Sequence, residues 1–384
     1  NFGGLWDNIA IRGLPGNENT GLATLLNGFS ANRGFNAPRD LAGVERIEFL
    51  KGTAAALYGS SEPGGTLNIV SKRPTWGFAN AVELYAGSFG MKRAAIDSTG
   101  VIGDSFAYRL NAAVDDRDSF RDEVSTKREV FAPALTWKLG RDTVLEYAGE
   151  ILRQKTPLDR GVVSLNTQLG VIPRSRFLGE PADGDVTVDN RTHQFILSHE
   201  WSSNWRSRLG LSYRETSLNG YSTEASALQP NGMLARQRRF RDYDSDDLAV
   251  QAELQGVVQT GAIEHELLLG VESYRFDIDT LMLRANPTAA RPYAIDIYNP
   301  VYGQAQPVPG PNTDTLEHQR DTALYVQDAI KLAPDWRLLA GARADSYRQS
   351  LLNRRTGLTT QQDVSATSPR IGLSWLPTPR WTVY

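Results

Sequence analysis

From about Thr75 onward, apolar and polar residues alternate along segments of roughly 10 to 15 residues, a pattern typical of strands in a membrane barrel. In FAYRLNAAV, Phe106 and Leu110 share one face, while Arg109 and Asn111 share the other. RSRLGLSYRE and WRLLAGARAD repeat the pattern. A charged face that persists through many strands is incompatible with the dry core of a sandwich. It favours a wall between lipid and a polar lumen.

The connections between the predicted strands alternate in length. Short connections are predicted at 100–104, 138–143, 201–205, 258–262, 332–336 and 376–381. Longer polar segments are predicted at 115–125, 156–189, 217–235, 278–317 and 349–363, and only the first hairpin, AGSFGM, is short where a long loop is expected. Short turns at one end and long loops at the other are typical of outer-membrane barrels, and counting through the pattern predicts about twelve strands and the start of a thirteenth.

Tryptophan residues gather beside the short connections. Six of the eight flank them: Trp137, Trp201, Trp205, Trp336, Trp375 and Trp381. Amphipathic indole rings favour membrane interfaces, so this placement predicts one aromatic girdle. The alternative is that the rings pack at strand ends of a soluble barrel.

An open sheet of this size would leave unpaired backbone groups in lipid, which is not tolerated. We therefore expect further residues to complete the barrel, because large plugged barrels have about 22 strands. The chain begins at Asn1 without a Met or a leader-like segment, and it ends within a strand pattern. We expect it to be a piece of a longer protein.

The composition excludes several classes. With 41 basic and 44 acidic residues, the chain lacks the basic surplus of a nucleic-acid-binding protein. No stretch approaches the ~18 apolar residues of a membrane-spanning helix. The absence of cysteine excludes disulfides and thiolate metal sites. The four histidines form no triad of metal ligands, and no nucleophile–base pair is visible, so we expect neither a metal site nor an enzyme.

The segment before Pro74 is dense in Gly, Asn, Ala and Pro, and it contains GTAAALYGSSEPGG. A phosphate-binding loop is disfavoured because the stretch has no G-K-[ST] ending and precedes no helix pattern. Its glycines, including Gly52 and Gly64, permit close packing and left-handed turns. We interpret them as structural residues.

VERIEFLKGTAAALYGSSEPGGTLNIVSKRP resembles the plug signature of TonB-dependent outer-membrane receptors, especially the ferric-siderophore group. Upstream of it, IAIRG and LLNGF match two further plug elements of that family, and downstream AGSFG, FAPALTW and DRG follow in family order. YNPVYG is similar to a loop of hydroxamate and pyoverdine-type receptors. The resemblance implies an all-β transmembrane barrel, present here as the N-terminal half (75–384), with an α+β plug (1–74) in its lumen.

The resemblance further implies an importer of ferric siderophores in the bacterial outer membrane. The siderophore is the transported ligand, and no permanent cofactor is expected. A TonB-type energy-coupling protein would bind a box upstream of Asn1, lipid would surround a monomer, and nucleic acid is not an expected partner. Alternatives are import of haem, cobalamin or a glycan by the same architecture, or a non-transporting receptor, porin or adhesin.

Candidate site residues come from the plug. A charge enclosed in a barrel needs a partner, because its desolvation costs several kcal/mol. The resemblance implies that basic residues lock the plug to wall carboxylates; the candidates are Arg12, Arg46 and Lys51. Candidate ligand contacts at the outward tips of the plug are Asn32, Arg33, Phe35, Arg12 and Tyr58, and their alternative is a solvated loop. The loops at 156–189 and 278–317 are expected to determine specificity.

Overall fold

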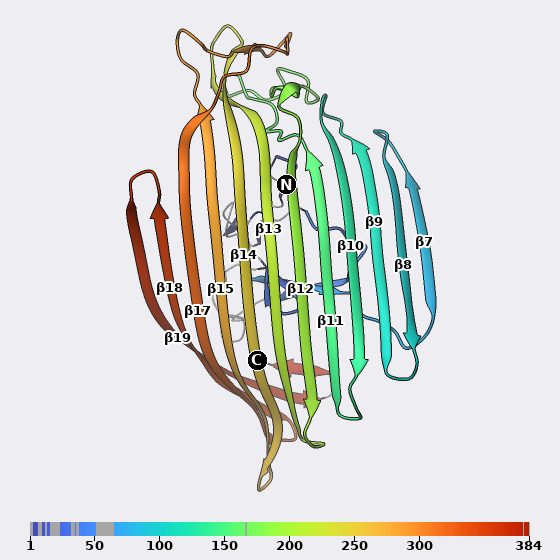
Figure 1. Ribbon diagram of the computed structural model, residues 1–384. Coiled ribbons are helices and arrows are strands. Elements are labelled where there is room, and N and C mark those ends of the chain that lie inside the picture. The colour runs from blue at the N-terminus through green and yellow to red at the C-terminus, as the bar shows by residue number, and fades with distance from the viewer. Residues whose placement is uncertain are drawn as a thin grey trace.

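A computed structural model describes residues 3–6, 10–11, 14–15, 24–31, 35, 38–50, 65–165, 167–378 and 380–383. Its dominant feature is a curved antiparallel sheet, here called the wall, whose strands follow one another in chain order (Figure 1). The wall strands are β7 (Ala79–Ala86), β8 (Lys92–Ile102), β9 (Phe106–Asp118), β10 (Ser125–Lys138), β11 (Thr143–Thr156), β12 (Val186–Glu200), β13 (Trp205–Leu228), β14 (Met233–Thr260), β15 (Ile263–Ala285), β17 (Gly310–Ala333), β18 (Trp336–Asn353), β19 (Leu358–Thr378) and β20 (Trp381–Val383). In the described part of the chain, this confirms twelve strands and a short thirteenth. The two-residue strand β16 (Ile295–Asp296) pairs with β14 off this path.

The predicted alternation of apolar and polar side chains along the wall strands is confirmed. Relative to a water-soluble protein the burial is reversed, with apolar side chains exposed and polar ones buried. On β13, Leu209 is 50% exposed on the outer face, whereas Arg214 on the inner face is 2% exposed. On β9, Val114 is exposed and Asn111 is buried. Exposed aliphatic residues opposite buried polar ones fit a wall with lipid outside and polar contents inside.

The short turns are confirmed. Strands β8–β9, β10–β11, β12–β13, β14–β15 and β17–β18 are joined by two to four residues each, at the lower edge of Figure 1. The β11–β12 and β15–β17 connections at the opposite edge are long and contain the 3-10 turn η1 (Pro181–Asp183) and β16. The short first hairpin, between β7 and β8, is also confirmed.

Two predicted loops are largely strand. In 217–235, only 229–232 lies outside β13 and β14, and in 349–363 only 354–357 lies outside β18 and β19. The prediction treated polarity as a loop signal, but a strand beyond the membrane can present polar side chains on both faces. Cross-strand contacts support the extension; the Tyr221 and Phe240 rings, for example, lie 4.7 Å apart.

Five of the six tryptophans beside the short turns are exposed; the sixth, Trp205, is partly buried. Trp336 and Trp375, on neighbouring strands, stack with ring centroids 6.0 Å apart. Trp201 and Trp381 are the most exposed, at 67% and 70%. This arrangement agrees with an interfacial girdle. The described residues contain no helix with the length and apolar content needed to cross a membrane.

The second body is an inner segment that contacts the concave face of the wall and lies behind it in Figure 1. It contains the pair β1 (Ala10–Ile11) and β2 (Leu14–Pro15), and a four-stranded sheet in the order β4 (Phe29–Ser30), β3 (Thr24–Leu26), β6 (Thr66–Ser71) and β5 (Val44–Leu50). β3 and β6 are parallel, and the other neighbours are antiparallel.

The main hydrophobic core lies between the inner segment and the wall. Leu5, Trp6 and Phe35 of the inner segment pack with wall residues that include Leu152 and Leu218. A smaller cluster lies within the inner sheet around Leu26 and Ile69. The two bodies therefore share one core, and separating them would expose apolar surface.

We expect Leu211→Arg, on the outer face of β13, to lower the free energy of unfolding of the full-length protein in lipid. Leu211 lies about midway along the 9–11 residues that span the membrane from Trp205. A charged side chain there should cost ~2–4 kcal/mol, whereas Ser203→Arg on the exposed short turn should cost ~0–1 kcal/mol. Denaturant unfolding in lipid vesicles measures both. Equal losses would contradict the membrane assignment of this face.

Candidate functional site

The β3–β4 hairpin is the tip of the inner sheet that contacts the wall. Asn27 and Gly28 both have left-handed φ values, 54° and 87°, as an Asn-Gly turn between two strands requires. The Asn27 side-chain amide donates to Gln194 Oε1 of β12 at 2.7 Å and to Ser71 Oγ at 3.0 Å. Gln194 Nε2 donates in return to the Leu26 carbonyl at 3.0 Å. The turn is therefore held to the wall through hydrogen bonds in both directions.

Phe29 follows the turn and is fully buried against the wall. Its ring packs with Ile196 and Ala249, and the Arg208 guanidinium lies 5.4 Å from the ring centroid. Gly210 leaves room for it, because a Cβ at Gly210 would come within 2.7 Å of the ring. The wall thus has a recess shaped for this side chain.

Two ion pairs join the loop before β5 to the wall. Arg39 donates to Glu150 of β11 at 2.8 Å. Asp40 accepts two hydrogen bonds from Arg93 of β8, at 2.7 and 2.8 Å. Asp40 is 4% exposed, so this bidentate ion pair is shielded from water and has a fixed geometry.

A third set of charges lies where the inner segment passes into the wall. Lys72 Nζ donates to Asp97 at 2.8 Å, and Arg109 donates to the same carboxylate at 2.9 and 2.8 Å. Arg73 donates to Glu146 at 2.8 Å, and its carbonyl accepts from Arg109. The KRP motif is therefore tied to the wall strands β8, β9 and β11.

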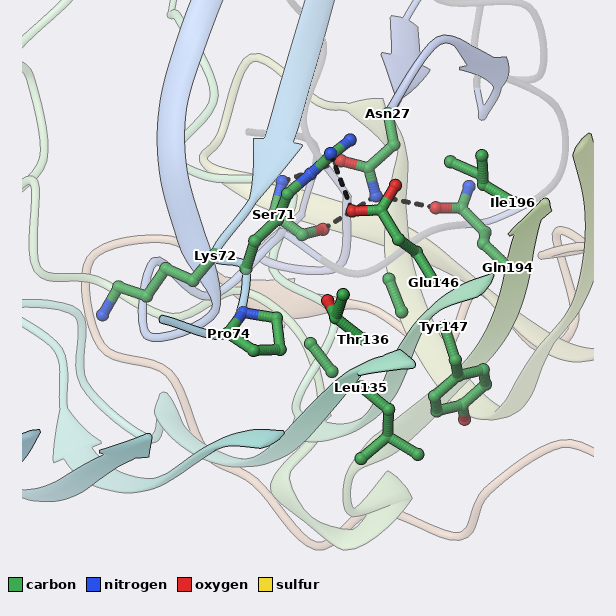
Figure 2. A pocket seen from close by; sticks show the side chains of 13 residues that line it. Asn27, Ser71, Lys72, Pro74, Leu135, Thr136, Glu146, Tyr147, Gln194 and Ile196 are labelled. Atoms are coloured by element: carbon green, nitrogen blue, oxygen red, sulfur yellow. Dashed lines mark hydrogen bonds and ion pairs between the residues drawn. The ribbon is translucent and has the colours of Figure 1, made fainter. Parts of the chain in front are cut away.

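A small pocket lies between these contacts. Figure 2 shows Asn27 directed toward Gln194 and Ser71, and Glu146 and Thr136 of the wall also line the pocket. Lys72 and Pro74 lie at its edge. Polar side chains from both bodies meet here, so water can replace these contacts at modest cost if the inner segment moves.

The long connections pack over one end of β14. Arg236 is completely buried; it donates to the carbonyls of Gly179 and Tyr293 and lies 3.4 Å from Glu180. Glu180 also accepts from the Gly303 amide at 3.0 Å. One arginine thus links the β11–β12 connection to the β15–β17 connection.

A second charged cluster lies on the other face of the same hairpin. Glu224 accepts from Arg241 at 2.6 Å and from Arg160 at 2.8 Å, and Ser222 Oγ donates to it at 2.9 Å. Arg239 lies 3.6 Å from the same carboxylate. Burial raises the pKa of Glu224, but the arginines around it outweigh burial and hold that pKa below its ordinary value.

Arg46 was predicted to pair with a wall carboxylate, and that pair is not seen among the described residues. Its guanidinium donates to Glu48 of the same strand at 2.7 Å, and the Arg46 side chain is 59% exposed. Neighbouring Glu45 is the residue of β5 that lies near the wall, 3.8 Å from Arg109. The pairing of β5 with β6 is irregular between Val44 and Arg46, which sets Glu45 apart, and the Arg46 side chain lies on Glu48 of its own strand.

Phe35 was predicted to contact ligand, but it is buried. Its ring packs between Trp6, at 5.4 Å, and Tyr243 of β14, at 4.6 Å. It therefore belongs to the shared core of the two bodies in this conformation. The other predicted site residues, Arg12, Asn32, Arg33, Lys51 and Tyr58, lie outside the described residues, as do Gly52 and Gly64.

The inner-segment charges that contact the wall in the described part of the chain were not among the named candidates: Arg39, Asp40, Glu45, Lys72 and Arg73. Their wall partners were partly readable, because Asp97, like Arg109 and Asn111, falls on the inward face by alternation. Within the described residues, no group of three or more His, Asp or Glu side chains could hold a metal ion. The site is therefore built from ion pairs, amides and aromatic rings.

Two protein-family models match the chain. The first, described as the TonB-dependent Receptor Plug Domain, matches residues 1–66. The second, described as TonB dependent receptor-like, beta-barrel, matches residues 135–384. They match in the order in which the inner segment and the wall occur along the chain.

Curated relatives are receptors and transporters. The chain is 40% identical over 360 residues to the metal-pseudopaline receptor CntO of Pseudomonas aeruginosa, covering 91% of this chain and 51% of the relative. It is 27% identical over 384 residues to the ferrioxamine receptor of Yersinia enterocolitica, covering 96% of this chain and 53% of that protein. The chain thus spans about half the length of these relatives.

Solved structures share the fold. The siderophore receptor PiuA from Acinetobacter baumannii matches with a TM-score of 0.86 at 19% identity, covering 98% of this chain and 58% of that chain. At this identity the likeness concerns the fold alone.

Asp40→Asn should loosen the inner segment. The substitution removes the negative charge that pairs with Arg93, whose remaining ion-pair partner among the described residues is Asp115, 3.7 Å away. Breaking a buried ion pair costs about 3 kcal/mol at the lower end of the usual range. Burial raises the pKa of Asp40. The Arg93 hydrogen bonds, the Ala42 amide and nearby positive charge together lower that pKa by more than burial raises it, so the net shift is downward. Its contribution should therefore be present above about pH 4 and be lost as the pH falls through the folded-state pKa.

Denaturant unfolding of the full-length protein at pH 7 and pH 3 measures this effect. The difference between wild type and Asp40→Asn should shrink at pH 3. The same difference at both values would contradict the role of the Asp40 carboxylate.

Proposed function

The chain belongs to the TonB-dependent receptor family of bacterial outer-membrane proteins, and from this premise we propose that it forms the plug and the first half of the barrel of an energised importer of ferric siderophores. The observation that carries the proposal is the inner segment held by ion pairs and amides against a charged concave wall. A porin would need an open lumen there.

We place the boundary between the two units at Pro74, with the plug at 1–74 and the barrel portion at 75–384. The inner sheet ends with β6 at Ser71, and the wall begins with β7 at Ala79. The intervening residues include Lys72 and Arg73, whose contacts with Asp97 and Glu146 hold the junction.

Import requires that the plug be displaced or remodelled, and the contacts between plug and wall suit that step. The ion pairs and the hydrogen bonds of side-chain amides can be exchanged for contacts with water. The burial of the shared apolar core around Phe35 favours the return of the plug to its position after transport. A TonB-type coupling protein, acting from the N-terminal side, would supply the work. We expect the two charged loop residues Arg39 and Asp40 to resist displacement most.

Ligand contacts are proposed on the plug tip at Asn32 and Arg33, with Arg12 and Tyr58 as further candidates. Amide and guanidinium donors suit the oxygen-rich surface of a ferric siderophore. Phe35 follows Asn32 and Arg33 closely in sequence, and its own ring packs against Tyr243 of the wall. We retain Phe35 as a ligand contact only for a conformation in which its ring leaves this core.

A second candidate ligand is a metal–pseudopaline complex. The 40% identical relative is named as a receptor for it, whereas the relative named for ferrioxamine is 27% identical. Both ligands are metal chelates, and the same architecture would import either. Haem, cobalamin and non-transporting roles are outcomes that the experiment below separates.

Uptake by a deletion strain tests the function. We expect deletion of the full-length gene to abolish uptake of one radiolabelled chelate from a panel of ferrichrome, ferrioxamine B, ferric pyoverdine, metal–pseudopaline, haem and cobalamin, under metal limitation. The wild-type gene should restore that uptake only in the presence of the coupling protein. Unchanged uptake of every chelate would contradict an importer, and restoration without the coupling protein would contradict energised transport.

A further inference from the structure

Strands β13, β14 and β15 carry a group of arginines on their inner face, toward the long-loop end of the wall. Arg239, Arg241 and Arg284 lie well beyond the roughly 9–11 residues that a barrel strand needs to span the membrane from the tryptophan rim. Arg160 reaches them from the β11–β12 connection. The group therefore borders the lumen on the side where loops, and not short turns, close the wall.

The register places like charges side by side. Arg239 is directly opposite Arg284 on β15, and on its other side it is opposite Ser222 of β13. Like charges directly opposite each other destabilise a sheet.

Glu224 is the one carboxylate that contacts this group in the described residues. Arg241 and Arg160 already donate to it, at 2.6 and 2.8 Å. Arg239 lies only within charge–charge range, at 3.6 Å. One negative charge thus serves three arginines, and Arg284 lies beside them.

The opposite face of β14 provides a comparison. Arg236 and Arg238 lie there by alternation, and each has a carboxylate of its own, Glu180 at 3.4 Å and Asp183 at 2.7 Å. That face is neutralised pair by pair and covered by the long connections. The inner face of the same strand carries excess positive charge.

The unpaired donors belong to the two opposed arginines. Among the described residues, Nε of Arg239 and Nε of Arg284 are buried and have no hydrogen-bond partner. Burial lowers the pKa of Arg239; Glu224 opposes this, and the positive charge of Arg241, Arg284 and Arg160 adds to the lowering. A guanidinium in this situation gains free energy from any anion that reaches it.

We propose that Arg160, Arg239, Arg241 and Arg284 form an anion subsite that takes carboxylate groups of a negatively charged metal chelate. The inference rests on the proposed import function and narrows its substrate class. Guanidinium groups present paired donors in a plane that matches a carboxylate, and two opposed arginines can clamp one between them. The side chains of Arg160 and Arg239 remain 29% and 17% exposed, so a ligand can reach them.

The experiment compares two iron chelates of different charge. Ferric citrate is an anionic polycarboxylate, and ferrichrome is an uncharged hydroxamate. Quenching of tryptophan fluorescence in the purified full-length receptor measures the binding of each to wild type, to Arg239→Gln with Arg284→Gln, and to Arg239→Lys. Arg238→Gln, one residue away on the opposite face, is the matched control for the loss of one charge.

We expect the double variant to lose about tenfold in affinity for ferric citrate per arginine removed, while ferrichrome binding changes by less than about twofold. Arg239→Lys should lose less affinity than Arg239→Gln would, because it keeps the positive charge, but should not restore wild-type binding, because it lacks the paired planar donors. Salt should weaken ferric citrate binding to wild type. The double variant should unfold at an unchanged or higher temperature, because it removes opposed like charges. Arg238→Gln should lower the unfolding temperature and leave the preference for ferric citrate intact.

Equal binding of ferric citrate by wild type and double variant would overturn the subsite, as would equal losses for both chelates. Wild type that binds ferrichrome but not ferric citrate would overturn the subsite and leave the import function standing. Failure to bind either chelate would also overturn the subsite, and the uptake panel then decides the import function separately.

Discussion

The structure depends on one constraint: the inner face of the wall is lined with charged and polar groups, and each of them needs a partner away from bulk water. Asp97, Glu150 and Arg93 obtain partners from the inner segment. The same face contributes glycine and aliphatic positions where the inner segment needs apolar contact. The inner segment thus fills the space inside the wall and also supplies the partners that its inward-facing charges need.

This constraint explains why the contacts divide into two kinds. The ion pairs of Arg39, Asp40 and Lys72 are directional and depend on the exclusion of water, so a small displacement weakens all of them. The packing of Phe29 and Phe35 falls off more gradually and keeps the two bodies aligned. An assembly of this kind is rigid at rest and can still release its inner segment when pulled.

The architecture of the wall was largely predictable from the sequence, because a period of two is visible within each strand and the turns carry their own signals. The ends of β13 and β18 were not, since polar strands beyond the membrane look like loops. Of the predicted site residues, only Phe35 and Arg46 fall among the described ones. Arg46 was expected to pair with the wall, but the face that it occupies depends on the register of β5. Asp40 pairs with Arg93, 53 residues away, and no local sequence pattern predicts that pair.

The recess at Gly210 has a consequence for the exchange of parts between related receptors. Phe29 occupies the space that a side chain at position 210 would need. The two residues belong to different bodies, yet their sizes are complementary, so a larger residue at one position requires a smaller one at the other. A plug and a barrel taken from two different receptors would therefore fit together only if the residues at these two positions are compatible in size.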